Sequence, residues 1–216
     1  MKLLSKEIRL AASPLSFLFV IGAFLAFVPG YPILLGAFFT TLGIFYSFQT
    51  TRENHDIVFS LLLPVSKAEV VKGKFAFSVF IELCSFTVMA IITVLRMTIL
   101  SGAAVYTNNA LMCANLTFLG FALLMFGMFN FCFIRGFFKT AYYFAKPFIG
   151  YLVIALVTIC AAETLHHLPG LAALNCFDFS VLGPQAAVFA AGLASFLLLT
   201  AAAVKGAVAS FERIDL

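Results

Sequence analysis

Two charged residues stand inside long apolar stretches of this 216-residue sequence, and they are the first candidates for chemistry. Glu82 lies in the stretch 75–100, and Arg96 follows it after about four turns of α-helix. The spacing predicts both side chains on one helix stripe, about 21 Å apart, which is too far for an ion pair. Charges at membrane depth are usually functional. Each is therefore predicted to line a polar route or an interface between protomers, with outward snorkelling to the headgroups as the alternative for Arg96.

Two amides, Asn115 and Asn130, lie in the next apolar stretch, 110–134. An amide within such a stretch either ties helices together or contributes to the same polar route. The sequence contains no nucleophile–base pair, Gly-rich phosphate loop or HExxH motif, and its five cysteines show no CxxC or Cys/His ligand spacing. We therefore predict neither a catalytic site nor a metal site in this chain.

The elements that position these residues are predicted to be membrane-spanning helices. The chain is 63% apolar and 10% charged, and its mean hydropathy is +1.12, which excludes an ordinary soluble protein. Spans of about 20 residues leave room for six helices and for no separate soluble domain. The sequence thus predicts an all-α, polytopic, single-domain protein (1–216) with spans at 15–28, 32–48, 75–100, 110–134, 147–164 and 184–204. The first is short, and is either a tilted span or a half-span paired with the second.

The basic residues indicate the orientation. All but one of the 13 Lys and Arg residues fall in the N-terminal segment, the loops 49–74 and 135–146, or the C-terminal part of the chain, and Arg96 is the exception. By the positive-inside rule, both termini and these two loops face the cytoplasm. The net charge of +4 is thus an orientation signal, and it gives no reason to expect a nucleic-acid partner.

The N-terminal segment 1–13 forms an amphipathic pattern at 100° per residue. Leu3, Leu10 and Ala11 belong to its apolar arc, whereas Lys6 and Arg9 fall on the polar arc. Such a helix is predicted to lie along the cytoplasmic interface with its basic side chains at the headgroups. It is either an ordinary helix leading into the first span or an elbow helix that braces a moving domain.

Small residues recur at seven-residue spacing in two predicted spans. Gly36 and Gly43 share one helix face, and so do Gly120 and Gly127. Because small residues let helices approach closely in lipid, these faces predict packing seams, mostly within one chain.

The loop 49–74 carries the most specific pattern. Ile57, Val58, Leu61 and Leu62 recur at i, i+1, i+4 and i+5, which predicts a short helix with one apolar face. This helix is too short to cross a bilayer, so its apolar face is covered either by the spans or by a partner protein.

A capping box follows this short helix. In Ser66-Lys67-Ala68-Glu69 the Ser66 hydroxyl can accept from the Glu69 amide while the Glu69 carboxylate reaches back to the Ser66 amide. The third long helix is therefore predicted to begin at Ser66, and it would transmit a push on the loop directly into a span.

The same loop resembles the signature of ABC-2 type permeases. In that family an acidic residue after the second span leads to a "sLPvsr-x-eiV-x-gK" stretch that opens the third. The matching positions here are Glu53, Asp56, Ser60-Leu61, Leu63-Pro64-Val65-Ser66-Lys67 and Glu69-Val70-Val71-Lys72-Gly73-Lys74.

The resemblance implies a non-catalytic permease subunit of the bacterial cytoplasmic membrane. It forms a homodimer, or a heterodimer with a second permease, and binds ABC ATPase subunits that hold the ATP and Mg²⁺. The loop would be the coupling helix that docks on the ATPase. The implied coupling residues are Glu53, Asp56, Ile57, Val58, Leu61, Leu62, Pro64, Ser66 and Glu69.

The chain resembles small family members, among which are exporters of amphipathic toxin peptides such as phenol-soluble modulins or bacteriocins. An amphipathic or hydrophobic peptide is therefore the expected substrate. Two alternatives remain at this point. One is the substrate-binding membrane subunit of a vitamin importer, with a pocket in the region 163–178. The other is an immunity or scaffold protein that transports nothing.

Overall fold

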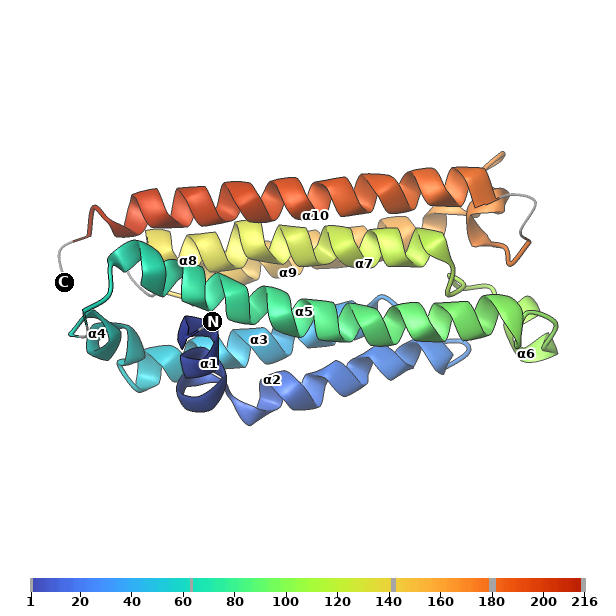
Figure 1. The fold of residues 1–216 in the computed structure, drawn as a ribbon. Helices are drawn as coiled ribbons and strands as arrows, with labels where there is room; N and C mark the ends of the chain where they lie inside the picture. The colour runs from blue at the N-terminus through green and yellow to red at the C-terminus, as the bar shows by residue number, and fades with distance from the viewer. Residues whose placement is uncertain (1, 63, 141–142, 179–181, 215–216) are drawn as a thin grey trace.

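The computed structural model describes residues 2–62, 64–140, 143–178 and 182–214, and it is helical with no strand in these ranges. Six helical segments run side by side along one axis (Figure 1). In chain order these segments are α2 (Pro14–Leu18) continued by the 3₁₀ helix η2 (Phe19–Phe27), α3 (Leu35–Glu53), α5 (Lys67–Thr98), α7 (Leu116–Phe129) continued by the π-helical turn η3 (Asn130–Ile134) and α8 (Arg135–Lys139), α9 (Ala145–Leu165), and α10 (Leu182–Phe211).

Shorter elements connect the six segments. At one end lie α1 (Lys2–Lys6), the π-helical turn η1 (Glu7–Ala11) and α4 (Asp56–Leu61); at the other lie α6 (Ala104–Thr107) and the 3₁₀ turn η4 (Ala172–Asn175). We call the first end the basic end, because every Lys and Arg of the described residues except Arg96 lies in its half of the bundle.

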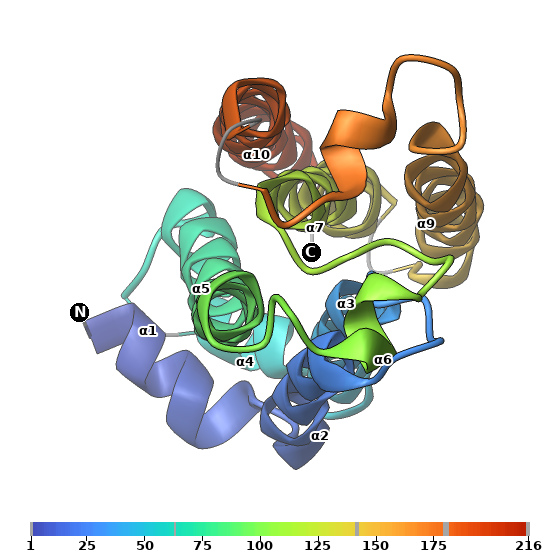
Figure 2. The same ribbon diagram turned by 90° about the vertical axis from the view of Figure 1, so that its right-hand side faces the viewer.

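Four of the described helices are long and apolar enough to cross a membrane. They are Lys67–Thr98, Leu116–Lys139, Ala145–Leu165 and Leu182–Phe211. Of the four, Leu116–Lys139 is the most buried inside the bundle. The view down the bundle axis shows the reason, because α7 stands between α10, α5, α3 and α9 (Figure 2). The chain is therefore a membrane protein with several apolar helices around a central α7.

The first two segments fall short of that criterion for separate reasons. The apolar helix Pro14–Phe27 is short, although its 3₁₀ part rises about 2.0 Å per residue and extends the segment to about 26 Å. The helix α3 has 19 residues but ends in the polar run Gln49–Glu53. The two segments pack against each other along their length.

The predicted start of the fourth span at residue 110 is wrong. The helix begins at Leu116, and residues 110–115 form an irregular segment that leads into it. Met112, Cys113 and Ala114 in this segment are apolar residues that are buried in the fold. By hydropathy alone they cannot be distinguished from the residues of a span. Asn115 is the N-cap of α7, and its side chain accepts a hydrogen bond from the Phe118 amide at 3.1 Å.

An aromatic cluster holds α3, η3 and α9 together. The rings of Phe45 and Phe148 stack with centroids 3.9 Å apart, and Phe48 meets Phe133 edge to face at 5.4 Å. Tyr151 is fully buried beside this cluster, and its hydroxyl is 2.8 Å from the Thr41 hydroxyl. Aromatic pairs in these geometries add stabilisation beyond the area that they bury.

The predicted small-residue seams are confirmed as contacts within the chain. A Cβ on Gly192 of α10 would lie 2.1 Å from the Gly120 carbonyl oxygen of α7, and a Cβ on Gly127 would lie 3.0 Å from the Phe196 Cα atom. The backbones of α7 and α10 therefore approach as closely as the missing side chains allow. Gly36 packs in the same way against the backbone of Gly22.

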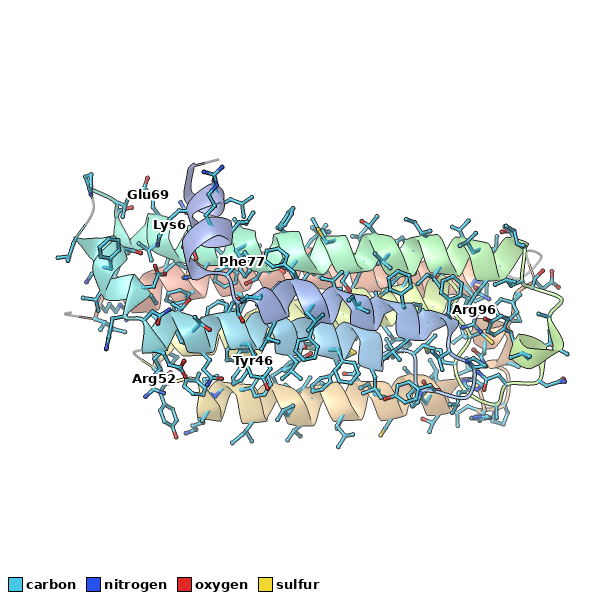
Figure 3. The ribbon with its side chains drawn as sticks, turned by 90° about the horizontal axis from the view of Figure 1, so that it is seen from below. Lys6, Tyr46, Arg52, Glu69, Phe77 and Arg96 are labelled. Carbon is cyan, nitrogen blue, oxygen red and sulfur yellow. The ribbon has the colours of Figure 1, made fainter. Side chains whose placement is uncertain are left out.

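The N-terminal helix lies across the bundle axis near the start of α5 (Figure 3). This placement agrees with the prediction of a helix parallel to the membrane plane. Its predicted apolar arc depends partly on Leu3, Leu10 and Ala11, of which the structure describes the backbone and not the side chains. The prediction that Lys6 reaches the headgroups is wrong, because Lys6 turns inward and meets α4.

Candidate functional site

The short helix α4 leaves the bundle at the basic end and exposes apolar side chains. It is separated from α3 by His55, whose φ of 50° places it in the left-handed region that ends one helix and redirects the chain. Val58 is 45% exposed, Phe59 57% and Leu62 80%. We call these three residues the α4 patch.

The α4 patch differs from the predicted apolar face. Ile57 is buried and Leu61 packs partly against the core, whereas Val58 and Leu62 point outward. The sequence reasoning passed over Phe59, although residues 58, 59 and 62 fall within about 100° of each other on a helix. The short helix therefore has two apolar sides, one that anchors it to the bundle and one that is free.

A cluster of four charges, two of them buried and two partly buried, fixes α4 to its neighbours. The Lys74 ammonium of α5 lies 2.6 Å from Glu7 Oε2 and 2.8 Å from Asp56 Oδ2. It also donates to the Thr51 hydroxyl of α3 at 2.8 Å. Lys6 lies 3.2 Å from Asp56 Oδ1. This ion cluster of Lys6, Glu7, Asp56 and Lys74 carries two charges of each sign and joins α1, η1, α4 and α5.

The electrostatics of Asp56 follow from this cluster. Burial alone raises the pKa of its carboxyl group, but the Lys74 and Lys6 ammonium groups outweigh burial and hold that pKa below its ordinary value of 3.8. Asp56 is therefore ionised at neutral pH and serves as an internal anchor. Asp56 is not part of the α4 patch, although the family resemblance placed it among the residues that would dock on the ATPase.

The predicted capping box at the start of α5 is confirmed. The Ser66 hydroxyl accepts from the Glu69 amide at 3.2 Å, and the Ser66 amide donates to Glu69 Oε2 at 2.8 Å. Pro64 is exposed just before this cap, and Leu63 lies outside the described residues. Glu53 is exposed at the end of α3, where its carboxylate accepts from the Gln49 amide at 2.9 Å.

A second polar cluster lies within the bundle. Asn130 is the first residue of the η3 turn, and its amide nitrogen donates to Glu82 Oε2 and to the Thr200 hydroxyl, both at 3.0 Å. Glu82 and Asn130 are fully buried. The structure thus joins two predicted residues from separate helices, and it places Glu82 inside its own protomer and not on an outer interface. π-Helical turns of this kind are frequent at functional sites.

The other two predicted route residues lie near the opposite end. Arg96 is fully buried, donates to the Ala26 carbonyl at 2.8 Å, and stacks over the ring of Tyr106 with its guanidinium carbon 4.1 Å from the centroid (Figure 3). Outward snorkelling of Arg96 is therefore wrong. Asn115 donates to the Leu174 carbonyl at 2.8 Å. Arg96 ties α5 to η2 and α6, and Asn115 ties the start of α7 to η4. Neither residue lies in the cluster of Glu82.

Polar groups of the region 163–178 are also used in internal contacts. Glu163 Oε2 accepts from the Met112 amide at 2.8 Å, and Asn175 Oδ1 accepts from the Cys113 amide at 2.6 Å. Within the described ranges, no group of three or more His, Cys, Asp or Glu side chains could hold a metal ion. The contacts bind the segment 110–115 to the end of α9 and to η4, and they do not favour a ligand pocket there.

The comparison with protein families identifies the class. The profile of the ABC-2 family transporter proteins matches residues 2–206. The chain belongs to this family of transport membrane proteins, whose members are generally non-catalytic and associate with an ABC ATPase. No curated protein and no solved structure matches the chain.

Proposed function

We propose that this chain is the permease subunit of an ATP-driven exporter, with six spans, both termini in the cytoplasm, and α4 as its coupling helix. One observation carries the proposal. The α4 patch is apolar, lies outside the six long segments at the basic end, and is attached to a helix long enough to span the membrane. An exposed apolar face of this kind fits a groove on a partner protein.

The attachment explains how a push on α4 would move a span. Lys74 and Asp56 lock α4 to the side of α5, and the capping box fixes the start of α5 at Ser66. Closure of an ATPase dimer around ATP and Mg²⁺ would displace the α4 patch, and this displacement would tilt α5 as a rigid body. Because α5 carries Glu82, the motion reaches the polar cluster in the bundle.

The substrate that fits this bundle is amphipathic or hydrophobic, such as a toxin or antimicrobial peptide. Glu82, Arg96 and Glu163 are the charged side chains at the middle and far depth of the described spans, and all three are engaged within the protomer. A polar solute would find few groups to replace its water. The transport route would form between two protomers, either two copies of this chain or this chain with a second permease.

The test is co-purification with a co-expressed ABC ATPase. Phe59→Asp and Leu62→Asp place charges in the α4 patch and should abolish complex formation and stimulation of ATPase activity. Tyr143→Asp is the matched control, because Tyr143 is 54% exposed outside α4 and its substitution should leave both readouts unchanged. Full ATPase binding by the two α4 variants would rule α4 out as the coupling helix.

A further inference from the structure

A groove runs between α5 and α10 at the basic end. It is shallow and open along one side, with a volume of about 590 Å³. Its floor includes Val204 and Val208 of α10, which pack partly against the core. Lys72 of α5 and Lys205 of α10 line it from its two sides. The groove is thus apolar along its length and basic on both walls.

Helix lengths place the two lysines at the level of lipid phosphates. The 32 residues of α5 and the 30 residues of α10 are about 48 and 45 Å long, whereas the hydrocarbon core is about 30 Å thick. Each helix therefore extends several ångströms beyond the core at each end. Lys72 and Lys205 lie about 8 and 9 Å from the ends of their helices at the basic end, which is the boundary between acyl chains and headgroups.

The charges of the groove are available to a ligand. Among the residues that the structure describes, no carboxylate lies within ion-pair distance of Lys72 or Lys205. Glu69, one turn from Lys72, is bound to Ser66. Lys67, at the start of α5, is engaged elsewhere and donates to the Ile214 carbonyl at 2.6 Å. Glu212 lines the groove toward that end and leaves a net charge of +1 among its lining residues.

We propose that this groove binds one anionic phospholipid. The phosphate lies between Lys72 and Lys205, and one acyl chain lies along the Val204 and Val208 floor. The complementary charge and the match in depth favour a lipid over a peptide or a second copy of the chain. Bound in this way, the lipid joins the coupling-side ends of α5 and α10. The inference requires only that the chain spans the membrane, and it does not depend on the ATPase or on the substrate.

Native mass spectrometry of the full chain in neutral detergent tests the proposal, with phosphatidylglycerol and phosphatidylcholine as probes. Wild type should retain one phosphatidylglycerol in preference to phosphatidylcholine. The variant Lys72→Gln/Lys205→Gln should bind phosphatidylglycerol at least about 5-fold more weakly. Lys139→Gln/Lys146→Gln removes the same charge from exposed sites at the same end and should bind like wild type. Equal loss in both variants, or no loss in the first, would overturn the proposal.

Two further measurements keep the result interpretable if the double variant folds poorly. Glu212→Gln removes the one carboxylate that lines the groove, so phosphatidylglycerol should bind about 2-fold more tightly. Glycerol phosphate, which lacks acyl chains, should not displace the lipid. Unchanged or weaker binding by Glu212→Gln contradicts the site, and displacement by glycerol phosphate would show a simple phosphate site instead of a lipid groove.

Discussion

Lys74 is the residue on which the basic end depends. Its ammonium group contacts Glu7, Asp56 and Thr51, so one side chain satisfies groups from η1, α4 and α3. Removal of one partner from a buried ion pair leaves an uncompensated charge and typically costs 3 to 5 kcal/mol. The N-terminal segment and α4 should therefore separate from α5 first when this residue is changed.

We expect Lys74→Met to lower the free energy of unfolding in detergent by about 3 kcal/mol. Lys139→Met, at an exposed position, should change it by less than about 0.5 kcal/mol. Adding Glu7→Gln to Lys74→Met leaves Lys6 and Asp56 as a balanced pair and should recover part of the loss. A double variant less stable than Lys74→Met would show that Glu7 is stabilised by contacts other than Lys74.

The pKa of Asp56 predicts the pH dependence of the same cluster. Because the pKa is depressed in the folded state, ionised Asp56 contributes stability above its ordinary value of 3.8 and loses that contribution as the pH falls through the lower folded value. Asp56→Asn should therefore lower the thermal midpoint at pH 7, and the gap to wild type should shrink below about pH 4. Glu53→Gln, at an exposed carboxyl, should show no such gap. A gap that stays constant down to pH 3 would contradict this assignment.

At the residue scale, the sequence predicted several polar residues that make structural contacts, but it did not predict the partners of those contacts. It singled out Asp56, Glu82 and Asn130, but it grouped Asp56 with a docking face and did not pair Glu82 with Asn130. These contacts join segments far apart in the chain, and no local spacing reports them. Neither Glu7 nor Lys74 was predicted to form an ion pair, because neither is conspicuous among the charged residues that flank the spans.

At the element scale, local patterns were reliable and hydropathy alone was not. The capping box at Ser66 requires only four neighbouring residues, so it could be predicted and is confirmed. The start of α7 could not be predicted from apolarity, because the buried loop residues 112–114 are as apolar as the helix. The N-cap at Asn115 is a local signal that would have corrected it.

The close packing of α7 on α10 gives a prediction for these elements. A Cβ at Gly192 would meet the Gly120 carbonyl oxygen at 2.1 Å, which forces backbone movement. Gly192→Ala should lower the free energy of unfolding by about 2 to 3 kcal/mol. Gly150→Ala in α9 is the control, because its Cβ meets nothing within 4 Å, and it should be neutral or slightly stabilising. Equal stability of the two variants would show that α10 can move away from α7 without loss.

At the scale of the whole molecule, the sequence predicted six spans and the side on which basic residues gather, whereas four of the described helices are long and apolar enough to cross a membrane. What it could not supply is the conformation of the first segment. Apolar composition does not distinguish a 3₁₀ helix from an α-helix, although the two differ by about 0.5 Å of rise per residue. This difference extends the 14 residues Pro14–Phe27 to about 26 Å, close to the hydrocarbon thickness.

The topology that follows from this length can be tested with single cysteines. In a background without the five native cysteines, Tyr31→Cys, Asn108→Cys and His167→Cys should react with a membrane-impermeant maleimide in whole cells. Asn54→Cys should react only after permeabilisation. Asn108, His167 and Asn54 are exposed and serve as references for the two sides. Tyr31 decides the question, because it lies in the turn between η2 and α3 and reaches the far side only if both segments cross. Labelling of Tyr31→Cys only after permeabilisation would mean that the first two segments form a re-entrant pair, and the bundle would then cross the membrane four times.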